Sequence, residues 1–288
     1  MAKLKKKTGF VLVGGGAKGS YEAGRMKVLA LRGIIPDVIF GTSTGAINAA
    51  GYALLGIDEL LNVWRGIKDI NDVMTRRFPL LWPYYLLIAK QKGIYSMSPL
   101  EKTINKLFTE EKFLKATIEA IVCRVSLKTS MKDYVSSRHL GLVASYKSFN
   151  RAVLASASTP IMNDVVDGEY VDGGVRQIAP LAPAIQADCT DIHVIQGEPF
   201  SQQCLFTGEV GNVTDVFNRT IGSMVQEMLW DDVNQCDMYN KNGIGRKINL
   251  TVWAPSTSLI GSDQFDPVLI EASIQQGLNQ VDPVFVSN

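Results

Sequence analysis

Apolar residues along the chain gather in short runs that end in glycine, and each run precedes a segment with helical spacing. Thr8 to Val13 leads into Gly14-Gly15-Gly16, and Val38 to Phe40 leads into Gly41. Such uninterrupted runs predict strands buried on both faces, as in a parallel sheet. The helices that follow them are predicted at Gly19–Leu31 and Ala46–Leu55. Strand, glycine turn and helix in this repeated order predict an α/β fold with a mainly parallel central sheet.

The remainder of the chain continues the alternation of helices and strands. Further helices are predicted at Asp58–Ile67, Ser98–Phe108, Val213–Tyr239 and Val268–Leu278. Further strands are predicted at Ala120–Leu127, His139–Ala144, Asp191–Ile195 and Ile248–Trp253, with a hairpin at Asp164–Asp172. The sequence contains no repeat, low-complexity tract or linker, so residues 1–288 are predicted to form a single domain.

The composition of the chain excludes several kinds of protein and of binding partner. Hydrophobic residues make up 46% of the chain and charged residues 20%, which indicates a globular protein with a large core. The net charge of +1 argues against nucleic acid as a partner. The four cysteines form no C-x-x-C pair and the chain has two histidines, so neither a metal nor a cofactor is expected. No secretion signal or spanning segment is recognised, which predicts a cytoplasmic protein.

The first glycine motif has two interpretations. Gly14-x-Gly16-x-x-Gly19 follows a predicted strand and matches the dinucleotide-binding pattern. That pattern also requires an acidic residue at the end of the second strand, whereas here Asp37 precedes that strand. Consecutive glycines also allow several N–H groups to converge on one negative oxygen, as in an oxyanion hole. We therefore favour Gly14, Gly15 and Gly16 as oxyanion donors and keep a nucleotide-binding protein as a rival.

The second glycine motif supplies a candidate nucleophile. Gly41-x-Ser43-x-Gly45 lies between a predicted strand and a predicted helix, which is the context of a nucleophile elbow. The glycines permit the sharp turn that holds a serine hydroxyl clear of the backbone. The N–H of Thr44, at the start of the helix, would then lie near the oxyanion. The alternative is a tight turn in which Ser43 only caps the helix.

A nucleophilic serine needs a base, and the chain offers few. His193 lies inside a predicted strand, which favours a structural role, and His139 precedes both carboxylate candidates in the sequence. Of two Asp-Gly steps, Asp167-Gly168 separates two β-type runs and is typical of a two-residue hairpin turn. Asp172-Gly173-Gly174 instead ends the returning strand, where a side chain can enter a cleft. Asp172 is therefore the predicted base.

These motifs resemble those of the patatin-like phospholipases. The family pattern is a G-G-G-x-[KR]-G loop, a G-x-S-x-G elbow and a D-G-[GA] motif, in that order. The matching residues are Gly14 to Gly19 with Lys18, Gly41 to Gly45, and Asp172 to Gly174. The segments Gly93–Leu100 and Ala155–Pro160 and the last 40 residues are also similar to family members, so the resemblance covers nearly the whole chain.

The resemblance implies a three-layer α/β/α fold and a Ser–Asp dyad that uses neither histidine nor calcium. It also implies hydrolysis of acyl esters of phospholipids or lysophospholipids, with an acyl-enzyme on Ser43. One departure concerns the run after Asp172, which reads Arg176-Gln177-Ile178 where family members often have an asparagine before a proline. A catalytically silent lipid-binding or interaction protein on the same fold is the second rival, and labelling by a fluorophosphonate would argue against it.

Two further features concern the surface of the protein. Lys18 is interpreted as a residue that stabilises the glycine loop or meets a lipid phosphate, with an exposed lysine at a helix start as the alternative. Phe78–Ile88 is strongly apolar, has basic residues on both sides and is too short to span a bilayer. It predicts an interfacial contact with a membrane or a lid, with a cap packed on the core as the alternative. A protein activator and delivery to another cell are left open.

Overall fold

The structure is a computed structural model, and it describes residues 6–77, 93–138, 146–201, 210–211 and 213–287. Its α-helices are α1 (Gly19–Leu31), α2 (Thr44–Leu55), α3 (Ile57–Arg65), α5 (Ser98–Leu107), α6 (Glu110–Lys115), α7 (Tyr146–Ser156), α8 (Leu181–Gln186), α9 (Val213–Lys241) and α10 (Pro267–Asn279). Its strands are β1 (Thr8–Leu12), β2 (Val38–Thr42), β3 (Thr75–Arg76), β4 (Gly93–Ser96), β5 (Glu119–Ser126), β6 (Lys132–Ser136), β7 (Ile161–Asn163), β8 (Tyr170–Asp172), β9 (Asp191–Ile195), β10 (Asn249–Trp253) and β11 (Phe285–Ser287).

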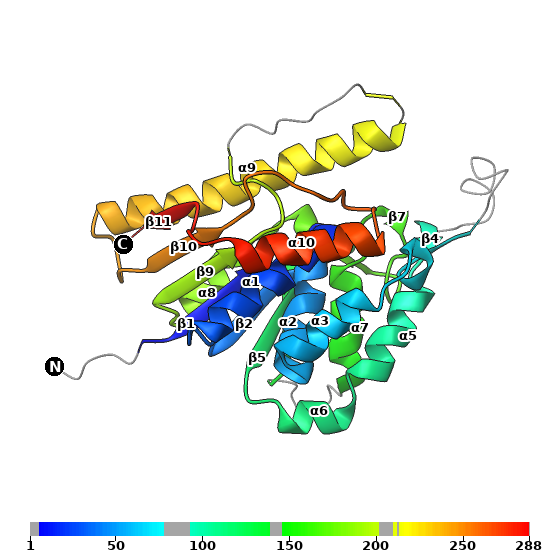
Figure 1. Ribbon diagram of the computed structural model, residues 1–288, viewed down its shortest axis with the longest axis horizontal. Helices are drawn as coiled ribbons and strands as arrows, with labels where there is room; N and C mark the ends of the chain where they lie inside the picture. The colour runs from blue at the N-terminus through cyan, green and yellow to red at the C-terminus, as the bar shows by residue number, and fades with distance from the viewer. Residues whose placement is uncertain (1–5, 78–92, 139–145, 202–209, 212, 288) are drawn as a thin grey trace.

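A mainly parallel sheet forms the centre of the molecule (Figure 1). Its strands follow the order β11-β10-β9-β1-β2-β5-β6, and β8 also pairs with β5. The inner neighbours from β10 to β5 are parallel, whereas β11, β6 and β8 run antiparallel to their partners. The prediction of an α/β fold with a mainly parallel sheet is therefore confirmed. A smaller sheet joins β3, β4 and β7.

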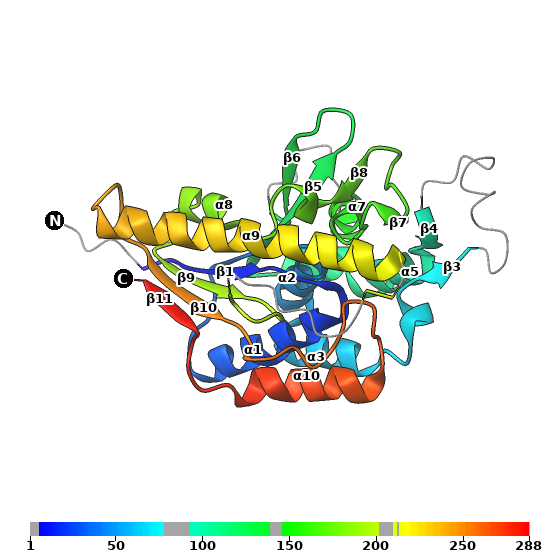
Figure 2. The ribbon, with the colours of Figure 1, turned by 90° about the horizontal axis from the view of Figure 1, so that it is seen from above.

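Both faces of the central sheet are covered by helices, as Figure 2 shows for α9 on one side and α1, α3 and α10 on the other. Strand β1 shows how the sequence produces this arrangement, because successive side chains of a strand point to opposite faces. Phe10 and Leu12 pack in the core with residues of α1, α2, α3 and α10. Val11 and Val13 pack in a second core with residues of α8 and α9. An uninterrupted apolar run is what a strand between two helical layers requires.

The topology brings the glycine motifs to one edge of the sheet. Strands β1 and β2 are parallel neighbours with Leu12 opposite Gly41, so both end at the same edge. In open α/β sheets the carboxyl ends of the strands form the binding crevice. Strand β8 reaches this region through β5, where Asp172 lies opposite Arg124. The glycine loop, the nucleophile elbow and the aspartate motif, which are far apart along the chain, therefore lie close together in the fold.

Most of the predicted helices and strands are present, and the structure also contains elements that the sequence did not predict. The hairpin prediction holds for its turn: Asp167 and Gly168 both have positive φ, 52° and 69°, and Val166 bridges to Tyr170. It is wrong in its pairing, because β8 forms its ladder with β5 rather than with the preceding segment. Helices α6, α7 and α8 and strands β3, β4, β6, β7 and β11 were not predicted. The predicted strand at His139–Ala144 lies outside the described residues.

Candidate active site

Ser43 occupies a sharp turn between β2 and α2. Its φ of 58° and ψ of −133° form a backbone conformation that side-chain-bearing residues rarely adopt, and such strain is concentrated at functional sites. The flanking glycines are needed for steric reasons: a Cβ on Gly41 would lie 2.2 Å from the carbonyl oxygen of Gly45. A Cβ on Gly45 would lie 2.4 Å from the carbonyl oxygen of Leu12. The turn places Ser43 in the wall of a large cavity.

A second serine supports this turn. The backbone N–H of Ser43 donates to Ser156 Oγ over 3.0 Å, and Ser156 Oγ donates to the carbonyl oxygen of Cys123 over 2.5 Å. Ser156 is buried at the end of α7 and Cys123 lies in β5. The side chain therefore joins the elbow to a strand and a helix that are distant in sequence. Apart from a serine in a small-residue segment, no pattern in the sequence indicated this role.

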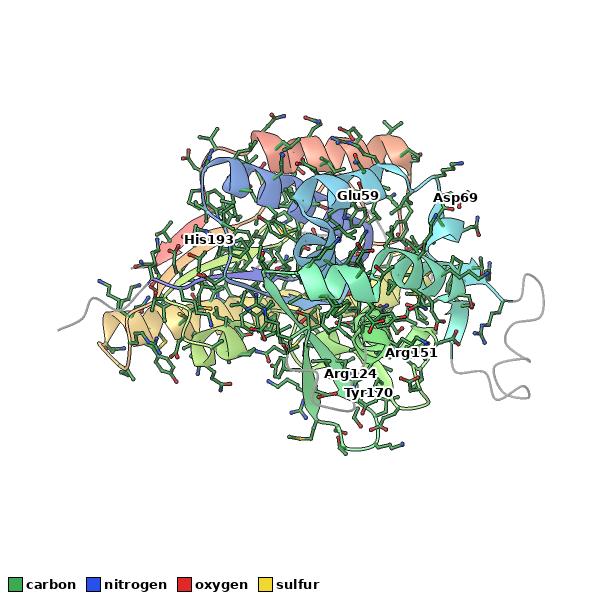
Figure 3. The ribbon with its side chains drawn as sticks, turned by 90° about the horizontal axis from the view of Figure 1, so that it is seen from below. Glu59, Asp69, Arg124, Arg151, Tyr170 and His193 are labelled. Atoms are coloured by element: carbon green, nitrogen blue, oxygen red, sulfur yellow. The ribbon has the colours of Figure 1, made fainter. Side chains whose placement is uncertain are left out.

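Asp172 is the last residue of β8 and is 6% exposed. Its Oδ1 accepts the backbone N–H of Gly174 over 2.7 Å, and its carboxyl group shares the cavity wall with Ser43, whose side chain lowers its pKa. The strand before it is fixed by the pairing with β5 and by Arg124, whose guanidinium lies 3.6 Å from the centre of the Tyr170 ring (Figure 3). The structure thus brings the predicted nucleophile and the predicted base together.

The environment of Asp172 alters its acidity. Burial raises the pKa of the carboxyl group from 3.8 to about 6, because the ionised form loses hydration. The hydrogen bond from Gly174 and the side chain of Ser43 favour the ionised form and lower the pKa, so they offset part of this effect. A carboxylate with a pKa near 6 is ionised at pH 7 and is a stronger base than an ordinary aspartate. This suits a general base that accepts a proton from a serine.

The glycine loop after β1 has φ values of 84°, 114° and 64° at Gly14, Gly15 and Gly16. The amide of Gly14 donates to Glu22 Oε1 over 2.6 Å, so this N–H is already occupied. The expectation that Gly14 donates to an oxyanion therefore needs correction. Within the described part of the chain, no acceptor meets the amides of Gly15, Gly16 and Thr44, which leaves these three as candidate donors.

The cavity at Ser43 has a volume of about 1700 Å³ and is lined by Asp172, by the glycine loop and by many apolar side chains. Ile47, Gly51 and Leu55 follow Ser43 along α2 at four-residue intervals and line the same cavity. This stripe extends for about 18 Å from Ser43, at a rise of about 1.5 Å per residue. Residues from α3 and α5 complete the apolar wall, among them Leu60, Val63, Leu100, Ile104 and Leu107.

A family model described as patatin-like phospholipase matches residues 10–185, which include both glycine motifs and Asp172. The chain belongs to the patatin-like phospholipase family. The curated protein "Lysophospholipase nte1" of Aspergillus terreus (strain NIH 2624 / FGSC A1156) is 29% identical over 171 residues, or 58% of this chain and 10% of that protein. The chain thus spans about a tenth of the length of this relative.

A solved structure, that of VipD from Legionella pneumophila, is similar to this chain with a TM-score of 0.42 and 14% sequence identity. The similarity covers 96% of this chain and 65% of the VipD chain.

In this patatin-like protein, the alternative candidates for the base, His193 and Asp167, lie outside the cavity at Ser43. His193 is buried in β9 (Figure 3) and accepts a hydrogen bond from Trp253 Nε1 at Nδ1 over 3.1 Å. It is not among the residues that line the cavity. Its predicted structural role agrees with these contacts. Asp167 occupies the turn and pairs with Arg151 over 2.7 Å. His139 lies outside the described residues.

Gln177, in the run after Asp172 that departs from the family pattern, supports the local structure. Gln177 is buried, and its Oε1 accepts hydrogen bonds from Lys132 Nζ, over 2.8 Å, and from the hydroxyl of Tyr134. Its backbone N–H donates to the carbonyl oxygen of Gly173 over 2.9 Å. Gln177 therefore ties the turn that follows Asp172 to strand β6. This support was not apparent from the sequence.

Other predicted features are settled only in part. Lys18 lines the cavity and pairs with Glu198. Cys123, Cys189 and Cys236 are buried free thiols, whereas Cys204 and the Phe78–Ile88 segment lie outside the described residues. Across the described ranges, no group of three or more His, Cys, Asp or Glu side chains could hold a metal ion. No helix in those ranges is long and apolar enough to cross a membrane.

Proposed function

We propose that this protein hydrolyses fatty-acyl esters of phospholipids or lysophospholipids through a Ser43–Asp172 dyad. The observation that carries the proposal is the placement of Ser43 together with the buried Asp172 carboxyl group, whose pKa it lowers, in the wall of a largely apolar cavity. Membership of the patatin-like phospholipase family and the similarity to a lysophospholipase support the class of substrate. We also propose that residues 1–288 act as a single domain without cofactor or metal.

The shape of the cavity favours a long acyl chain. One leaflet of a bilayer has a hydrocarbon thickness of about 15 Å, half of the whole core, and this is the length that an extended acyl chain fills. The apolar stripe from Ser43 to Leu55 extends over about 18 Å along α2, so a whole chain fits beside it. Burying such a chain away from water supplies the main favourable term in binding.

In the first half of the reaction, Ser43 Oγ attacks the ester carbonyl carbon while its proton passes to Asp172. The negative charge on the carbonyl oxygen is stabilised by the N–H groups of Gly15, Gly16 and Thr44. When the tetrahedral intermediate collapses, Asp172 returns the proton to the departing alkoxide, and the acyl group remains bonded to Ser43. One oxyanion donor is typically worth about 10²–10³-fold in rate.

In the second half, a water molecule attacks the acyl-enzyme and transfers a proton to Asp172. The new tetrahedral intermediate releases the fatty acid, and the proton returns to Ser43. Because one group accepts and returns protons in both halves, its pKa must lie close to the working pH, and that of Asp172 is raised to about 6.

The test compares Ser43→Ala and Asp172→Asn with matched controls outside the cavity, Ser273→Ala in α10 and Asp167→Asn in the turn. We expect the first pair to lose about 10³-fold or more in hydrolysis of phospholipids and lysophospholipids, and the controls to retain wild-type rates. A fluorophosphonate should label the wild type and not Ser43→Ala. Wild-type turnover by a folded Ser43→Ala protein would refute the proposal.

The same assay addresses the remaining predictions about partners. A panel of head groups and of one-chain and two-chain lipids, with and without cell lysate, measures the substrate preference and any requirement for an activator. Peripheral membrane contact through Phe78–Ile88 stays a prediction of the sequence, tested by vesicle flotation of the wild type against Trp82→Ala.

A further inference from the structure

Glu22 is a fully buried carboxylic acid that the mechanism does not use. It lies in the first turn of α1, is 0% exposed and does not line the cavity. Burying a carboxylate is costly unless hydrogen bonds replace its hydration. Its partners therefore indicate why an acid is present at this position.

Each oxygen of Glu22 accepts a hydrogen bond from a different part of the fold. Oε1 accepts the backbone N–H of Gly14 over 2.6 Å, and Oε2 accepts Asn48 Nδ2 over 2.8 Å. Asn48 is itself held from two sides: its Nδ2 donates to the carbonyl oxygen of Gly19 over 2.9 Å, and its Oδ1 accepts Trp64 Nε1 over 2.9 Å. One carboxyl group thus connects the glycine loop with helices α1, α2 and α3.

Gly14 is held between this carboxyl group and the nucleophile turn. Its φ is 84°, and a Cβ there would lie 2.6 Å from the carbonyl oxygen of Thr42 and 3.0 Å from Ser43 Cβ. The peptide that begins at Gly14 continues directly into Gly15 and Gly16. The orientation of the Gly14 amide therefore sets the position of the next two N–H groups relative to Ser43.

We propose that Glu22 is a positioning residue of the oxyanion loop: by accepting the Gly14 N–H, it fixes Gly15 and Gly16 at the distance from Ser43 that the transition state requires. The inference rests on the proposed function, because it concerns the same hydrolysis. Glu22 touches neither substrate nor reacting atoms, and its effect passes through the backbone. A misplacement of about 1 Å in such a site can cost about 10²-fold in rate.

The test uses two replacements of similar size that differ in what they can accept. Glu22→Gln keeps a carbonyl oxygen for the Gly14 N–H, whereas Glu22→Leu removes every acceptor. We expect Glu22→Leu to lower kcat about 10²-fold with KM changed by less than about threefold, and Glu22→Gln to stay within about tenfold of the wild type. The split between kcat and KM distinguishes positioning from substrate binding.

A structural control separates positioning from loss of stability. Asn240 in α9 ties that helix to the residue just before β10 through hydrogen bonds with Ile248, over 2.7 and 3.0 Å, and does not line the cavity. Asn240→Ala should lower the melting temperature and leave kcat unchanged. If Glu22→Leu does not fold, Glu22→Asp replaces it, because its carboxyl group is one methylene too short to reach Gly14; the same loss of kcat is expected.

The outcomes distinguish the two proposals. Wild-type kcat in folded Glu22→Leu or Glu22→Asp overturns the positioning role, while a loss of hydrolysis in Ser43→Ala in the same experiment leaves the proposed function intact. A kcat loss in Glu22→Gln as large as in Glu22→Leu also overturns it, since accepting the Gly14 N–H would then not be the requirement. If the wild type hydrolyses no ester, the proposed function fails and the positioning role falls with it.

Discussion

Replacing Asp172 by asparagine is expected to abolish hydrolysis and at the same time to stabilise the fold. The carboxyl group is buried, and its pKa is raised from 3.8 to about 6. Asparagine has nearly the same shape, and its Oδ1 can still accept the Gly174 N–H that now lies 2.7 Å from Asp172. The variant therefore removes a buried negative charge and preserves the contacts around it.

The size of the effect follows from the pKa. A shift of about 2 pKa units corresponds to about 3 kcal/mol at 1.36 kcal/mol per unit. Below pH 3.8 the carboxyl group is neutral in both the folded and unfolded states, so it has no effect. Between pH 3.8 and about 6 the unfolded chain ionises first, and the wild type loses stability as the pH rises. Above pH 6 the loss is complete.

The assay is urea unfolding of the wild type and Asp172→Asn at several pH values. The difference in the free energy of unfolding should be near zero at pH 3.5 to 4 and should reach about 3 kcal/mol in favour of the variant by pH 7. Other titrating groups act on both proteins equally and cancel in the difference. A variant that is no more stable than the wild type at pH 7, or whose advantage does not change with pH, would refute the reasoning.

Three other predictions concern the pH dependence of hydrolysis, the stability of the nucleophile turn and the acyl-chain preference of the cavity. The rate kcat/KM of the wild type should fall about tenfold per pH unit below pH 6, as protonation of Asp172 removes the base; a flat profile from pH 4.5 to 7 would exclude it as base. Ser156→Ala should lower the free energy of unfolding by about 1–3 kcal/mol, because the Ser43 N–H loses its acceptor; an unchanged urea midpoint contradicts this. Ile104 lines the cavity, so Ile104→Trp should shift the preference among p-nitrophenyl esters to shorter acyl chains. Asp167→Asn, a control outside the cavity, should leave the preference unchanged. An unaltered chain-length profile in Ile104→Trp argues against an acyl chain beside α5.

Local signals in the sequence were sufficient for the elbow. Gly41, Ser43 and Gly45 predict a strand-to-helix turn by composition and spacing, and the positive φ of Ser43 agrees with that prediction. The choice between Asp167 and Asp172 also followed from local pattern, because an Asp-Gly step between two β-type runs favours a tight turn. The roles of Ser43 and Asp172 in catalysis stay proposals, to be tested by the variants above.

The glycine loop shows where local pattern was insufficient. Three consecutive glycines predict N–H groups free to bind an anion, and the sequence offered no reason to separate them. The N–H of Gly14 is nevertheless occupied, because Glu22 lies eight residues later on the buried side of α1. A contact between a loop and a helix face depends on how the two pack, which spacing along the chain does not specify.

The sequence by itself determined the strands and helices around the two glycine motifs and their order: apolar runs form the strands, and glycines end them in tight turns, because these preferences act between residues close along the chain. Tertiary structure alone decided which strand β8 joins, how Ser156 and Gln177 support the two catalytic candidates, and how far burial raises the pKa of Asp172. Each of these depends on packing between segments tens to more than a hundred residues apart, and the loss of hydration that shifts a pKa exists only once those segments have closed around the carboxyl group.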